Sequence, residues 1–198
     1  NIVMLKAIYL QCLRYPALRK PLRLARSKLQ TIAGYTDPFF DLARIARESN
    51  ANLFIDIGCH HGDTLLRFIE SGVSCPVAAF DPFGGNIKKA QSVLQHHPQV
   101  QFYQLAISNS NGSARFFLNR NEQTSSLLEN DTGNIASFTE DTSSLGDCDV
   151  ATLTLDSWAQ QYGAQGPCVI KSDTQGAEGL VIAGGRAFIK EHCTAFYG

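Results

Sequence analysis

The chain has 198 residues, of which 44% are hydrophobic and 18% charged, as is typical of one globular domain with its own core. No apolar run approaches the roughly 20 residues that span a bilayer. The apolar stretch at the N-terminus is interrupted by Gln11 and Arg14, and no small-residue cleavage site follows it, which argues against a secretory signal. The six cysteines form no C-x-x-C pair. We therefore expect reduced thiols in a cytoplasmic protein.

Basic residues are concentrated near the N-terminus. Residues 1–33 hold seven of the 17 basic residues and none of the 18 acidic ones, so the remainder has ten basic residues and a net charge of −8. The segment reads as helical, divided by Pro16 and Pro21. Two interpretations stay open. A basic amphipathic segment can lie peripherally on an anionic membrane; alternatively these helices pack on the sheet edge or mediate dimerisation, which the two prolines favour. We expect no nucleic-acid partner.

A second helix is predicted to begin at Asp37-Pro38, where a capping residue precedes a proline at the first helical position. It is expected to run to about Ser49. We therefore assign residues 1–49 to an N-terminal helical extension and residues 50–198 to the main domain.

Short apolar runs alternate with segments of helical period in the first half of that domain. The apolar runs predict strands over 53–57, 76–80 and 100–105, and the segments between them predict helices over 63–71 and 85–96. This βαβαβ alternation is typical of a parallel sheet with helices on both faces.

The second half continues with less regular spacing. Strands are predicted over 113–118, 149–154, 168–172 and 194–197, with a helix over 176–190 behind the third of them. The chain ends inside the last predicted strand, so we expect a fragment from which C-terminal strands are missing.

A long polar stretch, residues 119–147, separates two of these strands. Nearly 30 residues without clear periodicity are unusual inside a compact domain and generally form a functional lid or a disordered segment. We expect a mobile lid over an acceptor pocket; the alternative is an insertion with no role.

The first motif with chemical content is DIGCHHG, where a predicted strand meets a helix. Gly58 permits a tight turn and close approach of a ligand to the backbone, and Gly62 begins a helix whose amides and dipole point into the same crevice. His60 stands where the dinucleotide fingerprint G-x-G-x-x-G has its second glycine. Asp56, before the first glycine, suits a cationic ligand carrying an ammonium and a sulfonium. An ordinary strand-to-helix turn is the structural alternative.

The second feature is Asp81, at the end of the next strand. A carboxylate there can bind both hydroxyls of a ribose, as in other nucleoside-binding open sheets. Pro82 and Phe83 can form a wall against adenine. Taken alone, an Asp before a Pro-Phe turn is more often a cap, but its place one βαβ step after Asp56 favours the ligand interpretation.

The third feature is IKSDTQGAE, again between a strand and a helix. Ligands of open α/β sheets bind outside the carboxyl ends of the strands, so Asp173 and Glu178 are expected to face the same crevice as Asp56 and Asp81. Glu178 is alternatively a first-turn residue favoured by the helix dipole. Lys171, inside the strand, is alternatively a paired lysine.

These motifs together resemble the FkbM family of methyltransferases. The matching segments, in the order of the family and over about residues 52–190, are FIDIGCHHGDT, VAAFDPFGGN, QLAISNSNGSARFF, Ser125-Ser126-Leu127, Thr154-Leu155-Asp156 and IKSDTQGAEGLVIAGG. The resemblance implies a Rossmann-like class I methyltransferase fold, S-adenosylmethionine as cofactor, and O-methylation of a hydroxyl on a sugar, glycan or other small natural product. The candidate cofactor-binding residues are Asp56, Gly58, Cys59, Gly62, Asp81, Pro82, Phe83 and Ala106.

Three positions depart from the family pattern. His60 replaces a frequent Asn, Asp81 a more frequent Glu, and Gln175 the usual Glu. The last weakens any argument for a dense acidic metal cluster, and we assign no metal site because no complete ligand set is visible.

Methyl transfer to a hydroxyl requires alignment of the acceptor and removal of its proton. Asp173 is the first candidate base, and His60 or His61 the next, because imidazole titrates near neutrality. The candidate catalytic residues are Asp173, Lys171, His60 and Glu178. A non-catalytic nucleoside-binding domain remains an alternative, as does a nicotinamide-dependent oxidoreductase, which the missing second glycine disfavours.

Overall fold

The computed structural model describes residues 21–22, 25, 38–119, 127 and 144–198. The predictions made for residues 1–33, and those for most of the polar stretch 119–147, therefore fall outside the described residues. No helix in the described part of the chain combines the length and the apolar character needed to cross a membrane.

The main sheet has five strands in the order β3-β2-β1-β7-β8, and every neighbouring pair is parallel. Its strands are β1 (Leu53–Ile57), β2 (Val77–Phe80), β3 (Val100–Tyr103), β7 (Cys168–Ser172) and β8 (Cys193–Tyr197). The chain leaves β1 towards β2 and β3 on one side and returns to β7 and β8 on the other. The strand order thus reverses between β1 and β7, which is where open α/β sheets form their binding crevice.

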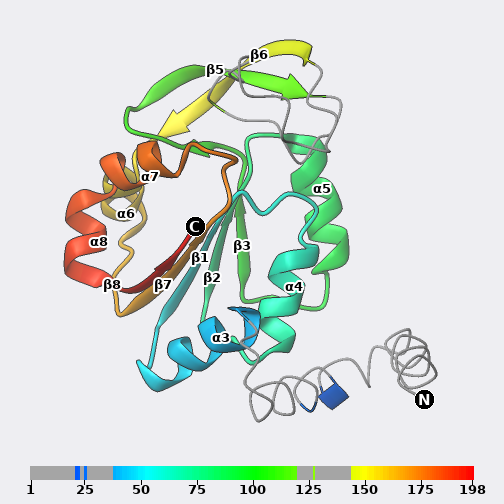
Figure 1. Ribbon diagram of the computed structural model, residues 1–198, viewed down its shortest axis with the longest axis vertical. Coiled ribbons are helices and arrows are strands. Elements are labelled where there is room, and N and C mark those ends of the chain that lie inside the picture. Colours follow the sequence, from blue (N-terminus) through cyan, green and yellow to red (C-terminus); the bar gives the residue numbers. More distant parts are fainter. Residues whose placement is uncertain (1–20, 23–24, 26–37, 120–126, 128–143) are drawn as a thin grey trace, which may run out of the picture.

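Helices pack on both faces of this sheet, as the alternation predicts (Figure 1). The resulting arrangement is the open, Rossmann-like α/β fold of class I methyltransferases. One face carries α3 (Pro38–Glu48), α4 (Asp63–Glu70) and α5 (Gly84–Val93), and the other carries α6 (Leu155–Tyr162), α7 (Glu178–Gly184) and α8 (Arg186–His192).

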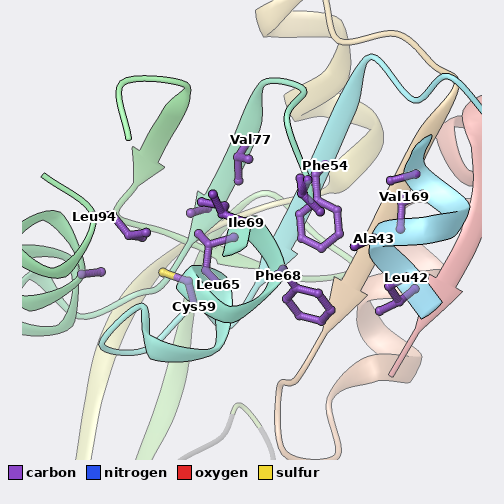
Figure 2. Packing of buried hydrophobic residues seen from close by; sticks show 14 of the residues in the cluster. Leu42, Ala43, Phe54, Cys59, Leu65, Phe68, Ile69, Val77, Leu94 and Val169 are labelled. Atoms are coloured by element: carbon purple, nitrogen blue, oxygen red, sulfur yellow. The ribbon is translucent and has the colours of Figure 1, made fainter. Parts of the chain in front are cut away.

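The face under α3, α4 and α5 forms one apolar cluster. In Figure 2, Phe54 of β1 faces Phe68 of α4, and Leu42 and Ala43 of α3 lie beside Val169 of β7. The rings of Phe54 and Phe68 are 5.2 Å apart, and Ala43 is fully buried. Helix α3, which the prediction places in the extension 1–49, thus buries its apolar face in the core of the domain; the division of the chain stays a prediction.

The opposite face is built around aromatic side chains. Trp158 of α6 meets Phe80 edge-on at 5.0 Å and Tyr103 edge-on at 5.5 Å. Ile55 and Ile170, on the two central strands, are fully buried beneath them. Because both faces are covered, the central strands are continuous apolar runs instead of alternating ones.

A second, three-stranded sheet lies outside the main one. It contains β4 (Ala106–Ile107), β5 (Gly112–Asn119) and β6 (Ser144–Leu153), in the order β4-β6-β5. The strands β5 and β6 pair antiparallel, and Figure 1 shows their ribbon above the carboxyl ends of the main strands. The strand predicted over 149–154 therefore begins earlier, at Ser144, inside the expected lid.

The helix predicted over 176–190 is two helices, α7 and α8, separated at Gly184-Gly185. A Cβ on Gly184 would collide with the carbonyl oxygen of Ser108, and one on Gly185 would lie 2.9 Å from Leu155. Glycine is therefore required at the junction of the two helices, because the backbone passes too close to neighbouring segments for side chains.

Candidate functional site

A cavity of about 230 Å³ opens at the carboxyl ends of β1, β2 and β7, beneath the β5–β6 ribbon. Its position at the reversal of strand order is the one that the fold predicts. Polar groups line one part of the cavity and apolar groups another. The polar lining includes His60, Asp81, Asn86, Asp173, Thr174 and Gln175, and the apolar lining includes Phe83, Leu105, Ala106, Ile107, Phe116 and Leu127.

The turn between β1 and α4 borders the cavity and has left-handed backbone at three positions. The φ angles are 80° at Gly58, 48° at His60 and 84° at Gly62. The amides of Gly58 and Cys59 both donate to the carbonyl of Phe80, each at 2.9 Å, which ties the turn to β2. The backbone thus places residues 58–60 along the wall of the cavity.

The two glycines of this turn serve packing. A Cβ on Gly58 would collide with the backbone carbonyl oxygen of Asp173, and a Cβ on Gly62 would lie 3.1 Å from Ala90 of α5. Gly58 is thus required by the close approach of the exit of β7, and it also lines the cavity; its part in ligand binding stays a prediction. Gly62 does lie at the start of α4, as predicted.

Asp81 organises the polar end of the cavity. Its Oδ1 accepts from the amide of Phe83 at 2.9 Å and from Asn86 Nδ2 at 3.1 Å, and its Oδ2 accepts from the amide of His60 at 3.0 Å. Burial raises the pKa of Asp81, and these three hydrogen bonds oppose that rise. A carboxylate offers about four acceptor positions, so about one remains, on Oδ2. The predicted bidentate contact with two hydroxyls is thereby reduced to one hydroxyl.

Asp56 lies under the cavity and does not line it. Its carboxylate is fully buried, 2.9 Å from Lys171 Nζ, at the matched position of the neighbouring strand. Burial raises the pKa of Asp56, and the ammonium group of Lys171 opposes this. The cation that Asp56 meets in the structure belongs to the protein; its part in cofactor binding stays a prediction.

Lys171 is correspondingly held as a cation. Burial lowers its pKa, but the carboxylate of Asp56 outweighs burial, so the pKa of Lys171 lies above its ordinary value of 10.5. Its Nζ also donates to the carbonyl of Gly58 at 3.0 Å. A lysine held in this way cannot accept a proton near neutral pH, so it does not act as a base.

Asp173 is the exposed carboxylate of the site. Its side chain is 54% exposed, with Oδ2 3.9 Å from Lys171 Nζ and Oδ1 accepting from Gln175 Nε2 at 2.8 Å. Its backbone amide donates to Ile57 at 2.9 Å, which links β7 to β1. The arrangement presents a carboxylate at the cavity with a cation on one side and an amide donor on the other.

The apolar wall comes from both sheets. Phe83, after β2, meets Phe116 of β5 edge-on at 5.0 Å. Ala106 of β4 and Leu127, a described residue of the expected lid, pack in the same cluster. Pro82 and Phe83 thus line the cavity together with Ala106. This wall can hold a flat, largely apolar ring.

The comparisons with known proteins agree with this geometry. A family model described as "Methyltransferase FkbM domain" matches residues 56–196, from the end of β1 to β8. The chain belongs to the FkbM methyltransferase family. It is also 26% identical over 140 residues to the "2-O-methyltransferase NoeI" of Sinorhizobium fredii (strain NBRC 101917 / NGR234). That alignment covers 68% of this chain and 57% of the relative, so the chain spans somewhat more than half of that protein's length.

A solved structure from Staphylococcus aureus, provisionally assigned as a caffeoyl-CoA O-methyltransferase, also matches part of the chain. It is 19% identical, covers 38% of this chain and 40% of its own, and superposes with a TM-score of 0.29. A likeness this partial adds nothing to the assignment, which comes from the FkbM family match.

Two segments that match the FkbM pattern make hydrogen bonds that stabilise the structure around the site. Glu178 does not line the cavity; its Oε1 accepts from the amide and the hydroxyl of Thr174 at 2.7 and 2.9 Å. Burial raises the pKa of Glu178, but hydrogen bonds from its own amide, from the amide and hydroxyl of Thr174 and from the amide of Gly176 outweigh it, so the pKa lies below its ordinary value of 4.5. Glu178 therefore shapes the loop after β7; its assignment as a catalytic residue stays a prediction.

The TLD motif of the FkbM pattern likewise joins helices. Thr154 caps α6 by accepting from the amide of Ser157 at 3.1 Å. Asp156 accepts from the amides of Ala187 and Phe188 at the start of α8, at 3.3 and 2.8 Å. This motif lies behind the site, where capping holds α6 and α8 together.

The predicted histidines and Cys59 lie beside the cavity. His60 lines it and stacks on His61 with ring centroids 3.7 Å apart, and Lys89 Nζ lies 3.0 Å from His61 Nε2. Cys59 is buried, and burial raises the pKa of its thiol, so this side chain stays neutral.

Sequence reasoning missed several lining residues of the FkbM site. Asn86 had a usable signal, a polar residue in the first turn of the helix that follows Asp81. Phe116 and Leu127 lie in segments that match the family pattern, but nothing in those segments indicates a contact with the cavity, which the two residues reach from the second sheet and the loop beyond it. Within the described ranges no group of three or more His, Cys, Asp or Glu residues could hold a metal ion.

Proposed function

We propose that this chain is an S-adenosylmethionine-dependent O-methyltransferase that acts on a hydroxyl of a sugar, glycan or other natural product. Membership of the FkbM family supports methyl transfer. The observation that carries the finer proposal is the exposed carboxylate of Asp173 in the same cavity as Asp81 and the Phe83–Phe116 wall.

The residues present suit the proposed cofactor. Asp81 has about one acceptor position for a ribose hydroxyl, and the aromatic wall suits an adenine ring. S-adenosylmethionine, when bound, supplies an electrophilic methyl group.

The roles of the protein groups follow from their charge and exposure. Asp173 takes the proton from the acceptor hydroxyl, because it is the exposed carboxylate of the cavity. His60 is the second candidate for this role, since it also lines the cavity. Lys171 keeps its proton and Cys59 stays a thiol, so neither accepts a proton near neutral pH.

The similarity to a 2-O-methyltransferase favours a sugar-like hydroxyl as the acceptor. A nicotinamide-dependent oxidoreductase remains disfavoured, because His60 occupies the place of the second glycine that a pyrophosphate needs. A non-catalytic nucleoside-binding domain would need no exposed carboxylate beside the ligand pocket, so Asp173 argues against it.

The experiment compares wild type with Asp173→Asn, and uses Asp149→Asn as control because Asp149 is exposed on β6 outside the cavity. Each protein is incubated with S-adenosylmethionine and a panel of methyl glycosides, and the methylated products are quantified by mass spectrometry. We expect Asp173→Asn to lower methyl transfer by about 10²–10⁴-fold while calorimetric affinity for S-adenosylhomocysteine changes by about twofold or less. Undiminished transfer by Asp173→Asn would reject this role, and absence of S-adenosylhomocysteine binding to wild type would reject the proposed function.

We also propose a cytoplasmic location, which the free cysteines of the described residues support. Peripheral contact of residues 1–33 with an anionic membrane is a further proposal, and its support is the basic charge of that segment.

A further inference from the structure

A buried ion pair lies under the cavity at the reversal point of the sheet. Asp56 on β1 and Lys171 on β7 occupy matched positions on neighbouring strands, and their side chains are 0% and 3% exposed. Removing two charges from water has a high desolvation cost, which only close contact and further hydrogen bonds can offset. The contacts of Lys171 therefore show what the pair does here.

Lys171 contacts three groups that belong to two different strand exits. Its Nζ lies 2.9 Å from Asp56 Oδ1, donates to the Gly58 carbonyl at 3.0 Å, and lies 3.9 Å from Asp173 Oδ2. Gly58 begins the left-handed turn that brings His60 to the cavity wall. One ammonium group thus holds the exit of β1 and faces the exposed carboxylate after β7.

Backbone hydrogen bonds around Lys171 connect the same strand exits. The amide of Asp173 donates to Ile57, and the amides of Gly58 and Cys59 donate to Phe80 of β2. The carbonyl of Gly58 is hydrogen-bonded as well, because it accepts from Lys171 Nζ. Hydrogen bonds therefore join the exits of β1, β2 and β7 in one network. Lys171 takes part in this network through its charged side chain.

We infer that Lys171 is a positioning residue: anchored by Asp56, it holds the Gly58 turn and the Asp173 carboxylate in the arrangement that binds the cofactor and receives the proton. The part that concerns Asp173 rests on the proposed function, whereas the part that concerns the Gly58 turn is a property of the protein without ligand. A pair that served folding alone would affect stability, and cofactor affinity would then follow only the folded fraction.

The test uses variants that separate these two cases. Lys171→Met leaves the buried carboxylate of Asp56 without its cation and can fail to fold. The double variant Asp56→Asn with Lys171→Met removes both charges at nearly constant volume, and Asp56→Asn alone is the mildest change. Arg44→Met is the matched control, because Arg44 pairs with Glu48 at 3.1 Å on the exposed side of α3.

Two measurements are made on each folded variant at equal folded fraction. Calorimetry gives the affinity for S-adenosylhomocysteine, and amide hydrogen exchange without ligand reports the order of residues 58–62. We expect the double variant to bind about tenfold or more weakly and these amides to exchange about tenfold or more quickly. Arg44→Met is expected to leave both unchanged.

Wild-type affinity and wild-type exchange in the folded double variant would overturn the inference. If the double variant does not accumulate as folded protein, Asp56→Asn decides by the same two readouts. If wild type itself does not bind S-adenosylhomocysteine, the proposed function fails. The exchange rates then still decide whether Lys171 orders the Gly58 turn.

Discussion

Glu178 is an acidic residue whose surroundings determine a different role from the one its motif suggests. Its Oε1 accepts two hydrogen bonds from Thr174, so it closes the loop that carries Asp173 and Gln175. Gln175 in that loop has a left-handed φ of 55° and donates to Asp173 Oδ1. A non-glycine residue in this conformation is strained by roughly 1–3 kcal/mol, and the surrounding hydrogen bonds must hold it there.

A pH dependence of stability follows from Glu178. Its folded pKa lies below the ordinary value of 4.5, so its stabilisation is complete above that value and is lost as the pH falls through the folded pKa. The side chain at position 178 in Glu178→Gln carries no charge at any pH. We expect it to lower the free energy of unfolding by about 1 kcal/mol near neutral pH, given the partial exposure of the side chain, and by progressively less on acidification below the ordinary value.

Urea unfolding at a series of pH values from neutrality to well below the ordinary value checks this. Glu48→Gln is the control, because Glu48 is exposed and, among the residues that the structure describes, pairs with Arg44 of the same helix. A deficit in Glu178→Gln that stays constant with pH would show that the carboxylate charge contributes nothing.

Among the elements, the turn between β1 and α4 is the one that sets the site. It meets β2 through two amides and the exit of β7 through the close approach of Gly58 to Asp173. A turn packed between two strand exits has little freedom to adjust. Its geometry therefore depends on having glycine at position 58, where φ is 80°.

Gly58→Ala tests this dependence. The new methyl group would collide with a backbone carbonyl in a conformation that L-residues rarely adopt, so we expect a loss of more than about 3 kcal/mol in the free energy of unfolding. Gly85→Ala is the matched control, since nothing lies within 4 Å of its Cβ and it sits in helix α5. That variant is expected to be neutral or to gain up to about 1 kcal/mol. Comparable urea midpoints for the two variants would show that the turn can relax.

At the scale of the whole molecule, the cavity joins two sheets. Asp81 and the turn at Gly58 come from the main sheet, while Phe116 comes from the second one. A ligand that touches both is expected to stabilise the folded chain as a unit, because it binds the native state and not the unfolded one.

Thermal unfolding with ligands gives a direct readout. S-adenosylhomocysteine at about 100 times its dissociation constant adds about 2.7 kcal/mol, which for a domain of this size raises Tm by roughly 5–10 °C. NAD at the same concentration is expected to leave Tm unchanged, because the turn has His60 where a pyrophosphate needs glycine. A larger shift with NAD would favour the oxidoreductase interpretation.

Much of the main sheet could be predicted from the sequence. The strands over 53–57 and 168–172 have the predicted bounds, and α3 begins at Pro38 as expected. Strands buried on both faces are continuous apolar runs, which makes them easy to recognise. The prediction of one helix over 176–190 was wrong, because α7 and α8 are separate; the two glycines at their junction pack against Ser108 and Leu155, which lie far away in the chain.

The candidate site was predictable only at the level of which residues gather. Parallel strands end at a common edge, so the sequence alone determined that Asp56, Asp81 and Asp173 would lie near one another and that the fold would be an open α/β sheet. Their roles as cofactor or catalytic residues stay predictions.

Only the tertiary structure decided which carboxylates line the cavity and how each one is paired. Asp56 is buried and pairs with Lys171. Asp81 accepts three hydrogen bonds from other groups of the protein, and the side chain of Asp173 remains exposed. Burial and pairing depend on which strands become neighbours and on which side chains meet in register. The contacts of Lys171 with Asp56 and Gly58 join residues more than 100 positions apart in the chain, and local sequence patterns carry no information about them.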